Sequence, residues 1–476
     1  MKRHLTYRVL GILIVIISLS SCVPSMKLRN EHKNVPNAYT NVVDSSNSAL
    51  LRWNSFFTDP DLIALIDTAL RNNQELNIMK MEIDIANNEV RAAKGEYLPT
   101  VDLGLGAGIE KVGKYTSQGQ SDLDHEYEEG KEVPEHLQDY MFGFFASWEI
   151  DIWKKLRNKK QAAVYRYLAS VEGRNFMVTH LVAEIANSYY ELLALDNQLA
   201  IVNRNIDIQT DALKIVKLQK QAAQVTELAV KKFEAEVLKN RSQQFDIQQE
   251  IVEVENRINF LVGRYPQPVA RHSENFTELI PTVVQEGIPS QLLENRTDVK
   301  QAELELTAAK LDVKAAKAAF YPSLSIRAGV GLNAFNIKYF ITNPQSILYN
   351  VAADLMAPLV NRNGIKASYF SAGSRQMQAI FDYERTILNA FTEVSNQLSM
   401  VDNLNNSYEL KTQQVQALTE SIDISTILFR SARADYMEVL MTQRDALEAK
   451  MELVETKKRQ MNAMVNIYQA LGGGWR

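Results

Sequence analysis

Arg91-Ala-Ala-Lys-Gly-Glu-Tyr-Leu-Pro99-Thr-Val-Asp-Leu-Gly-Leu-Gly-Ala-Gly108 decides the fold, because the chain contains this stretch twice. The second copy is Lys314-Ala-Ala-Lys-Ala-Ala-Phe-Tyr-Pro322-Ser-Leu-Ser-Ile-Arg-Ala-Gly-Val-Gly331, and the two align without a gap. Each copy runs from a helical pattern, through a proline, into an alternating strand pattern. A unit used twice predicts internal pseudo-symmetry. Two units that both end in strands favour an architectural protein over one built around a catalytic pocket.

The alternating patterns predict four strands, at about 99–112, 138–150, 322–334 and 346–357. In the first strand, apolar side chains at every second position alternate with Asp102 and glycines. The apolar set is Val101, Leu103, Leu105, Ala107 and Ile109. Each strand reaches the roughly 9–11 residues that a tilted transmembrane strand needs. We expect the glycines on the opposite face to keep the interior of a barrel open.

A long helical region follows each pair of strands. Apolar residues recur in it at every seventh position: Ile185, Leu192, Leu199, Ile206 and Leu213 in the first region, and Val394, Val401, Tyr408, Val415, Ile422 and Phe429 in the second. A seam of this length predicts coiled-coil packing. The two seams superpose at one offset, so the duplication includes the helices. A helix of about 65 residues would reach roughly 100 Å, which exceeds a bilayer, so we expect it to project into water.

The N-terminus is typical of a bacterial secretory signal, which we assign to residues 1–21. Lys2, Arg3 and Arg8 precede an apolar stretch, 9–19, that is too short to span a bilayer. The stretch ends in Leu19-Ser-Ser-Cys22, which resembles a lipobox. Cys22 is the single cysteine of the chain, and we expect it to carry the lipid anchor, with a buried thiol as the alternative. Several acyl chains on Cys22 would hold the protein stably on a membrane.

Composition and motifs exclude other classes of protein. The 476 residues carry a net charge of −5, whereas nucleic-acid binding requires a basic face. The six histidines form no His-Glu-x-x-His pattern, and the chain has no Gly-x-Ser-x-Gly elbow. We therefore expect no enzymatic activity, no cofactor and no metal site. The acidic loop 114–137 is either a divalent-cation site at the cell surface or, more commonly for such a run, a soluble external loop.

Four strands are too few to close a barrel, which needs about eight. An open sheet edge is not tolerated in lipid, because its backbone groups would stay unsatisfied. We therefore expect the chain to oligomerise, and three copies would supply twelve strands.

Two segments resemble the signatures of TolC-type outer membrane efflux proteins, and in particular the lipoprotein outer-membrane factors of RND-type pumps. Trp53-Asn-Ser-Phe-Phe57-Thr-Asp-Pro60-Asp-Leu62 resembles the N-terminal signature. Ile288-Pro-Ser-Gln-Leu-Leu293-Glu-Asn-Arg296-Thr-Asp298 resembles the signature that opens the second repeat, with Thr297 where the family usually has proline. The resemblance extends over essentially the whole mature chain.

The resemblance implies a mostly helical chain with a transmembrane β part. Three chains would form one TolC-like duct, in which a twelve-stranded barrel continues into a coiled-coil α-barrel. The expected segments are a lipidated N-terminal segment at 22–60, a first repeat at 61–263, a linker at 264–288, a second repeat at 289–471 and a tail at 472–476. The duct would lie in the outer membrane, lipid-anchored through Cys22, with its helices in the periplasm.

The implied function is passive export of drugs or other small toxic compounds. An inner-membrane RND transporter and a periplasmic adaptor would deliver them to the homotrimer. One alternative is the outer membrane duct of a type I protein-secretion system, which shares the fold. A periplasmic adaptor or coiled-coil scaffold would not explain the strands, and for a lipid-anchored enzyme we find no catalytic constellation.

The resemblance also places the adaptor contacts at two helical tips, 219–230 and 429–439. The residues expected to contact the adaptor are Ala223, Thr226, Glu227, Ala432, Arg433, Asp435 and Tyr436. Ala223 and Ala432 stand where the family usually has glycine. Glu438, Asp435 and Glu227 are expected to ring a closed aperture and to favour cations, the alternative being solvated charges on helix ends.

Overall fold

The structure is a computed structural model that describes residues 23–39, 46–282, 284–342, 344–431 and 433–475. The signal segment and Cys22 lie outside these residues. The chain divides into two compact units. Unit 1 comprises the N-terminal residues up to Asn30, Asp84–Tyr167 and Leu304–Ile380, and unit 2 comprises Glu31–Ile83, Leu168–Glu303 and Phe381–Arg476.

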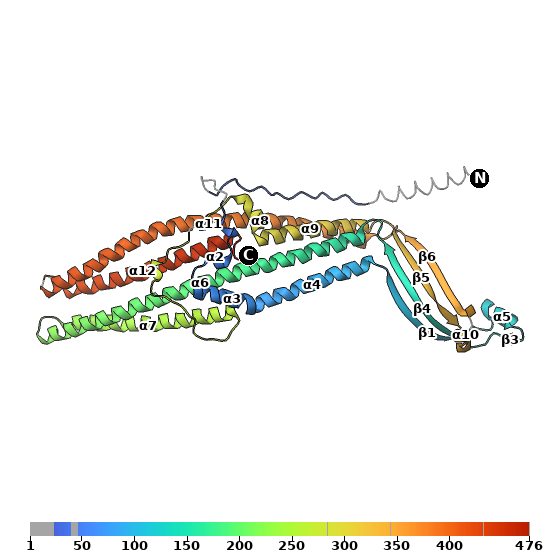
Figure 1. The fold of residues 1–476 in the computed structure, drawn as a ribbon, viewed down its shortest axis with the longest axis horizontal. Helices are drawn as coiled ribbons and strands as arrows, with labels where there is room; N and C mark the ends of the chain where they lie inside the picture. The colour runs from blue at the N-terminus through green and yellow to red at the C-terminus, as the bar shows by residue number, and fades with distance from the viewer. Residues whose placement is uncertain (1–22, 40–45, 283, 343, 432, 476) are drawn as a thin grey trace. The chain divides into compact units, whose positions relative to one another are not determined.

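Unit 1 contains a four-stranded antiparallel sheet in the order β1-β4-β5-β6 (Figure 1). The strands are β1 (Thr100–Glu110), β4 (Leu137–Ile150), β5 (Ser323–Ala334) and β6 (Ile347–Met356). Leu105 lies opposite Phe142, Phe142 opposite Leu332, and Leu332 opposite Ile347. Because successive side chains alternate between faces, this register places the apolar sets of all four strands on one face.

The opposite face of the sheet carries glycines, and the ring of Phe145 lies over them. A Cβ at Gly104 would stand 2.8 Å from Cε2 of Phe145, and one at Gly329 would stand 3.0 Å from its Cδ1. The expectation that glycine keeps this face open is therefore wrong at this level. The missing side chains make room for an aromatic ring instead.

The acidic loop is more regular than its composition predicts. It contains α5 (Ser117–Asp124), which Thr116 caps through its side chain, and a short hairpin of β2 (Glu126–Glu128) and β3 (Lys131–Glu132). The shorter loop between β5 and β6 holds α10 (Ile337–Thr342) and η4 (Pro344–Ser346).

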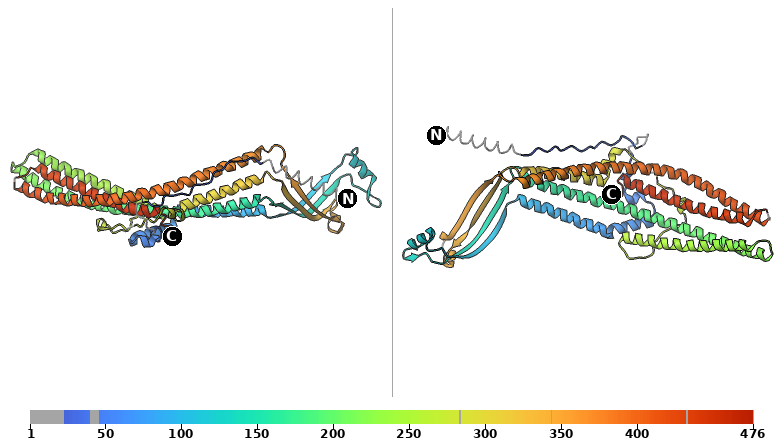
Figure 2. Two further views of the ribbon diagram at one scale, coloured as in Figure 1. Left: turned by 90° about the horizontal axis from the view of Figure 1, so that it is seen from above. Right: turned by 180° about the vertical axis from the view of Figure 1, so that it is seen from behind.

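Six helices make up most of the remaining chain. They are α4 (Gln74–Tyr97), α6 (Lys155–Gln221), α7 (Glu227–Val262), α9 (Thr297–Ala318), α11 (Asn363–Arg430) and α12 (Tyr436–Ala470). In unit 2, α7 runs beside α6 and α12 beside α11, which Figure 2 shows in both of its views. None of the described helices combines the length and the apolar composition needed to cross a membrane.

The core of unit 2 forms around the first signature segment. Asp59 caps α3 (Pro60–Asn72) with one carboxylate oxygen and accepts a hydrogen bond from the Tyr189 hydroxyl with the other, at 2.9 Å. Phe56, which ends α2 (Trp53–Phe56), stacks on Tyr468 with ring centroids 3.9 Å apart. The signature therefore stabilises the fold, because its residues join α3, α6 and α12.

Two equivalent joints connect the ends of shorter helices in unit 2. Gly263 ends α7 with a φ of 77°, and a Cβ there would stand 2.7 Å from the carbonyl oxygen of Asn72. Gly472 follows α12 with a φ of 93°, and a Cβ there would stand 2.7 Å from the carbonyl oxygen of Asn295. The offset from Gly263 to Gly472 equals that from Ile185 to Val394 in the two seams, so the duplication extends to the joints.

The segment between the repeats packs on unit 2 through an ion-pair network. Arg271 forms two hydrogen bonds with Asp196, at 2.6 and 2.9 Å, and one with Glu255 at 2.5 Å. This segment contains η2 (Phe276–Glu278). The other short elements of unit 2 are η1 (Ser48–Leu50), η3 (Pro289–Gln291) and α8 (Leu292–Asn295).

Candidate functional site

The turn between α6 and α7 forms the first predicted tip. Its backbone is closed by hydrogen bonds from the Ala223 N–H to the Lys220 carbonyl and from the Gln224 N–H to the Gln219 carbonyl. Ala223 has a φ of 55°, in the left-handed region that favours glycine. The turn thus keeps the backbone geometry of a glycine turn although the residue is alanine.

The charge at this tip is partly neutralised within the chain. Glu227, in the first turn of α7, forms an ion pair with Lys220 at the end of α6. The hydrogen bond from Lys220 holds the pKa of the Glu227 carboxyl below its usual value. Thr226 begins α7 without using its side chain as a cap, so this exposed hydroxyl keeps its hydrogen-bonding capacity.

The turn between α11 and α12 forms the second tip. The Arg433 N–H donates to the Leu428 carbonyl at 2.9 Å, and the Glu438 N–H donates to the Asp435 carbonyl at 3.1 Å. The side chains of Arg433, Asp435 and Glu438 are exposed, and Asp435 does not cap α12. Ala432 lies outside the described residues.

The two tips pack against each other. Val230 and Phe233 of α7 form a buried cluster with Leu440 of α12, and Tyr436 and Met437 pack on it. The tips therefore form one continuous surface within the chain. Tyr436 is half-buried in this cluster, whereas the other described residues expected to contact an adaptor are exposed.

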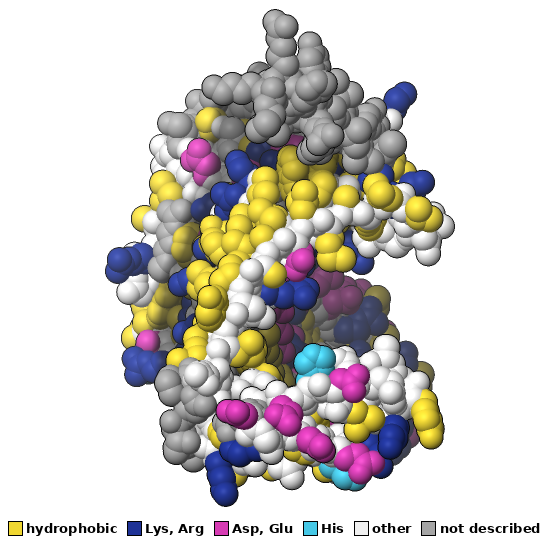
Figure 3. Space-filling view, turned by 90° about the vertical axis from the view of Figure 1, so that its right-hand side faces the viewer, with side chains coloured by type: hydrophobic (Ala, Val, Ile, Leu, Met, Phe, Trp, Pro, Cys, Tyr) yellow, Lys and Arg dark blue, Asp and Glu magenta, His cyan; other side chains and the backbone are white. Residues whose placement is uncertain are grey.

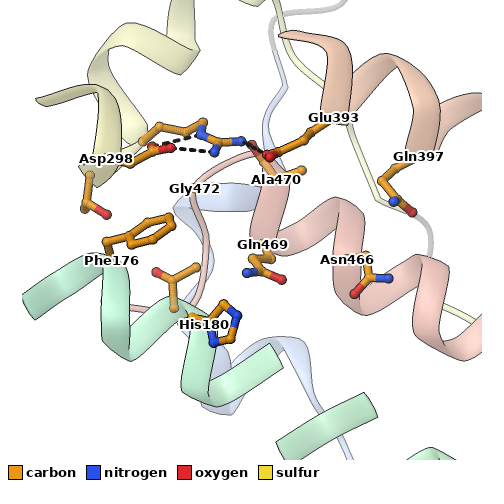
Figure 4. Close-up of a pocket in the computed structure, with 12 residues that line it drawn as sticks. Phe176, His180, Asp298, Glu393, Gln397, Asn466, Gln469, Ala470 and Gly472 are labelled. Carbon is orange, nitrogen blue, oxygen red and sulfur yellow. Dashed lines mark hydrogen bonds and ion pairs between the residues drawn. The ribbon is translucent and has the colours of Figure 1, made fainter. Parts of the chain in front are cut away.

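Arg296 belongs to the second signature segment, and a polar cavity of about 330 Å³ lies beside it (Figure 4). Its guanidinium donates to Asp298 at 2.6 and 2.9 Å, to Glu393 at 2.5 Å and to the Ala470 carbonyl at 3.1 Å. Burial lowers the pKa of Arg296, but its hydrogen bonds and charge pairing with Asp298 and Glu393 outweigh burial and raise it. Arg296 is thus a permanently charged anchor between α9, α11 and α12.

Within the described residues, no group of three His, Cys, Asp or Glu side chains is arranged to hold a metal ion. The acidic side chains of the loop 114–137 therefore show no preformed cation site there. Glu135 instead pairs with Lys111 at 2.6 Å.

The sheet of unit 1 presents an exposed apolar surface. On its apolar face Leu105, Tyr349 and Val351 are 77%, 79% and 77% exposed. The outer edges of β1 and β6 pair with no other described strand. A long, apolar, unpaired edge is a template for joining another strand.

Comparison with known proteins decides the family. The family model described as outer membrane efflux protein matches residues 65–264 and 288–473. The chain belongs to the outer membrane efflux protein family. The two matched regions follow the internal duplication.

Relatives support the same assignment over nearly the full length. The chain is 28% identical over 432 residues to the pyoverdine export outer membrane protein OpmQ of Pseudomonas aeruginosa, with 91% of this chain and 89% of OpmQ covered. It is 26% identical to the probable outer membrane lipoprotein SilC of Salmonella typhimurium, with 89% and 88% covered. The open-state structure of the Neisseria gonorrhoeae MtrE outer membrane channel matches with a TM-score of 0.82 at 21% identity, covering 95% of this chain and 98% of that one.

These findings confirm the predicted fold class, that of a TolC-like channel whose chain is mostly helical and carries a four-stranded sheet. They also confirm the function as an outer membrane efflux channel, and they favour efflux over type I protein secretion. Members of this family are channels rather than enzymes.

Sequence reasoning missed two features of these sites. The position of Phe145 on the glycine face could have been found, because Phe144 and Phe145 are adjacent in a strand and must point to opposite faces. The left-handed backbone of Ala223 has no signal in the residue type itself, since alanine is compatible with the helices on either side. Only the resemblance points to it, because the family usually has glycine at this position.

Proposed function

We propose that three copies of this chain join through β6 of one copy and β1 of the next, and so close a twelve-stranded barrel in the outer membrane. The observation that carries the proposal is the register of the sheet, which puts every apolar set on one face and leaves two complementary edges. Because β1 and β6 run in opposite directions, pairing between copies continues the antiparallel order. Closure satisfies the edge backbone groups, which lipid requires.

The duct would serve as the exit of a tripartite pump for small toxic compounds. An inner-membrane RND transporter supplies the energy and the choice of substrate, and a periplasmic adaptor links it to the tips. Ala223, Thr226 and Glu227 of one tip, and Ala432, Arg433, Asp435 and Tyr436 of the other, form the proposed adaptor surface. The exposed side chains and the packing of one tip on the other support this assignment.

Glu438, Asp435 and Glu227 are the proposed aperture residues. Three copies would repeat them around the channel axis, and a ring of carboxylates favours cations. Glu227 contributes less to the negative electrostatic potential of this ring than Asp435 and Glu438, because its carboxylate forms an ion pair with Lys220 of the same chain.

Lipid attachment at Cys22 would add an anchor next to the barrel. The residues that follow Cys22 support this position: Val23, Met26 and Leu28 pack on a buried cluster that includes Phe320 and Tyr369. Phe320 lies three residues before β5 begins. The described residues that follow Cys22 therefore pack beside the start of the sheet.

The duct function is tested by expressing the chain with an adaptor and an RND transporter in a bacterium that lacks its own channel. We expect drug tolerance to be restored, and purified protein to conduct ions in planar bilayers. Wild-type protein that inserts but neither conducts nor restores tolerance would overturn the proposal.

The aperture is tested separately with Asp435→Ala/Glu438→Ala. Its cation preference should fall relative to wild type, while the control Glu75→Ala/Glu82→Ala, which removes two exposed acids of α4, should keep it. Unchanged selectivity in the tip variant would reject the aperture role and leave the duct intact.

A further inference from the structure

The ends of the helices next to the sheet are strongly basic. The segments 91–97, 151–166, 310–321 and 362–366 contain thirteen Lys and Arg against three Asp and Glu, in a chain whose net charge is −5. All four segments belong to unit 1, and each one adjoins a strand. Four separate parts of the sequence thus bring positive charge to one end of the sheet.

The few acidic side chains here are already paired. Glu96 pairs with Lys159 at 3.5 Å, and Asp151 pairs with Arg157 at 3.3 Å. Asp312 forms an ion pair with Arg166.

The remaining cations are therefore in excess. Seven Lys and Arg of these segments form neither an ion pair with an acidic side chain nor, as Arg362 does with Phe320, a hydrogen bond to a backbone carbonyl of the described residues. We name them the basic collar: Arg91, Lys94, Lys154, Lys160, Lys314, Lys317 and Lys366.

The basic collar lies next to one end of the apolar face of the sheet. Each of its residues falls within about two turns of the helix end that adjoins a strand, which is about 10 Å. Trp153 stacks on Tyr321 at this junction, with ring centroids 4.7 Å apart, and its indole N–H donates to the Pro322 carbonyl at 2.8 Å. Trp and Tyr with one apolar and one polar end are typical of the boundary between lipid and water.

A cavity of about 400 Å³ opens at the same junction. Its lining mixes apolar groups, including Trp153, Met356 and Pro358, with the ion pair of Lys155 and Glu149. A wall that is apolar on one side and charged on the other suits a molecule with an acyl part and a phosphate part.

The opposite end of the sheet has the opposite charge. The loop segment 111–137 holds seven Asp and Glu against three Lys. In Figure 3 hydrophobic side chains form a broad band on the face turned to the viewer, and acidic side chains gather below it. The net charge therefore has opposite signs at the two ends of the apolar face. A general role of charged residues in solubility would apply to both ends equally, so it does not explain why one end is basic.

We propose that the basic collar binds the phosphate groups of anionic phospholipids in the membrane leaflet nearest the helices, and so fixes the depth of the sheet. This rests on the membrane location given under Proposed function. Basic residues next to a membrane-spanning segment attract anionic lipid headgroups at the membrane surface. Lys27, close behind Cys22, adds a further positive charge to the segment that packs on Phe320 and Tyr369.

The test compares the full-length wild type with Lys94→Gln/Lys314→Gln/Lys317→Gln/Lys366→Gln. Its control, Lys214→Gln/Lys217→Gln/Lys231→Gln/Lys239→Gln, removes the same charge from helices of unit 2. Detergent-purified protein is titrated with phosphatidylglycerol, and bound lipid is counted by native mass spectrometry. Phosphatidylcholine and inorganic phosphate serve as separate probes.

We expect wild type and control to bind phosphatidylglycerol in preference to phosphatidylcholine, with binding that weakens as salt rises. The collar variant should bind phosphatidylglycerol about tenfold more weakly or worse. Equal binding by collar variant and control would overturn the proposal. So would inorganic phosphate that competes fully at millimolar concentration, since the surface would then be a general anion site.

Conductance separates this proposal from the duct itself. A collar variant that changes ion selectivity but keeps its phosphatidylglycerol binding would place these side chains in the conduit and would also overturn the proposal. Wild type that fails to insert into bilayers would instead count against the duct. If the wild type inserts and conducts but shows no preference for phosphatidylglycerol, the lipid-binding proposal for the basic collar is overturned and the duct proposal is not affected.

Discussion

Gly263 ends α7 directly against Asn72, so that any side chain at Gly263 would meet the carbonyl oxygen of Asn72 within 2.7 Å. The second repeat builds the same contact between Gly472 and Asn295. Asn73 completes the first joint by donating to the Leu261 carbonyl, and Arg296 completes the second by donating to the Ala470 carbonyl. The duplication has therefore kept the geometry of the joint while its polar partner changed from an amide to a guanidinium.

The joints predict that Gly263→Ala and Gly472→Ala each lower the free energy of unfolding by about 1–3 kcal/mol. Both the left-handed backbone and the carbonyl contact oppose a Cβ. Chemical denaturation of the purified protein measures the effect. Gly95→Ala is the control, because its Cβ meets open space in α4 and alanine favours the helix. If Gly263→Ala and Gly472→Ala are as stable as Gly95→Ala, the two joints do not require glycine and this prediction is contradicted.

The tip turn predicts the reverse effect for an added glycine. Ala223→Gly should raise the free energy of unfolding by about 0.5 kcal/mol, since relief of the left-handed strain exceeds the added flexibility of the unfolded chain. Ala222→Gly, one residue earlier, should instead lose stability, because Ala222 does not have a positive φ. If both glycine variants lose stability equally, Ala223 is not strained.

The proposed location of the apolar face in lipid predicts a strong effect of charge at Leu105. Leu105→Lys should destabilise the folded protein in bilayers by about 2–4 kcal/mol. Asn350→Lys adds the same charge to the opposite face of the sheet and should cost little. Denaturant titration of both variants in phosphatidylcholine vesicles measures the difference. Equal tolerance of lysine on the two faces would place the sheet outside lipid.

Buried Lys457 predicts a pH dependence of stability. Lys457 lies between α11 and α12 with its ammonium 4.6 Å from the ring centre of Tyr408. Burial lowers the pKa of Lys457 from its usual 10.5. A lysine with a lowered folded pKa destabilises the protein while it is charged, so stability rises with pH from that lowered value up to 10.5.

Lys457→Met should therefore raise the free energy of unfolding at pH 7 by about 1 kcal/mol. The gain should shrink as the pH approaches 10.5. Lys217→Met makes the same substitution at an exposed position of α6 and is the control. A gain that stays constant with pH would mean that better packing, not removal of charge, explains the result.

The sequence predicts those parts of the fold in which apolar residues recur at a regular spacing. Strict alternation from Val101 to Ile109 is compatible only with a two-faced strand, and the heptad from Ile185 to Leu213 only with a long packed helix. The acidic helix α5 was missed because Ser117–Asp124 is short and polar, without an apolar stripe.

The tip residues were reached by resemblance, and their geometry depends on tertiary packing. Nothing in the local sequence around Tyr436 shows that its ring is half-buried against α7. The basic collar was missed for a related reason. Its residues come from four separate segments, and only the antiparallel sheet brings those segments to one level.

The most direct test of the central claim is the number of chains in the detergent-purified particle, measured by light scattering with correction for bound detergent. Closure through β1 and β6 predicts three chains, each lighter than the 54.0 kDa of the full sequence by the signal segment 1–21, and loss of the particle when detergent is withdrawn. A single chain that stays dispersed without detergent would show that the sheet edges need no partner, and would contradict the account.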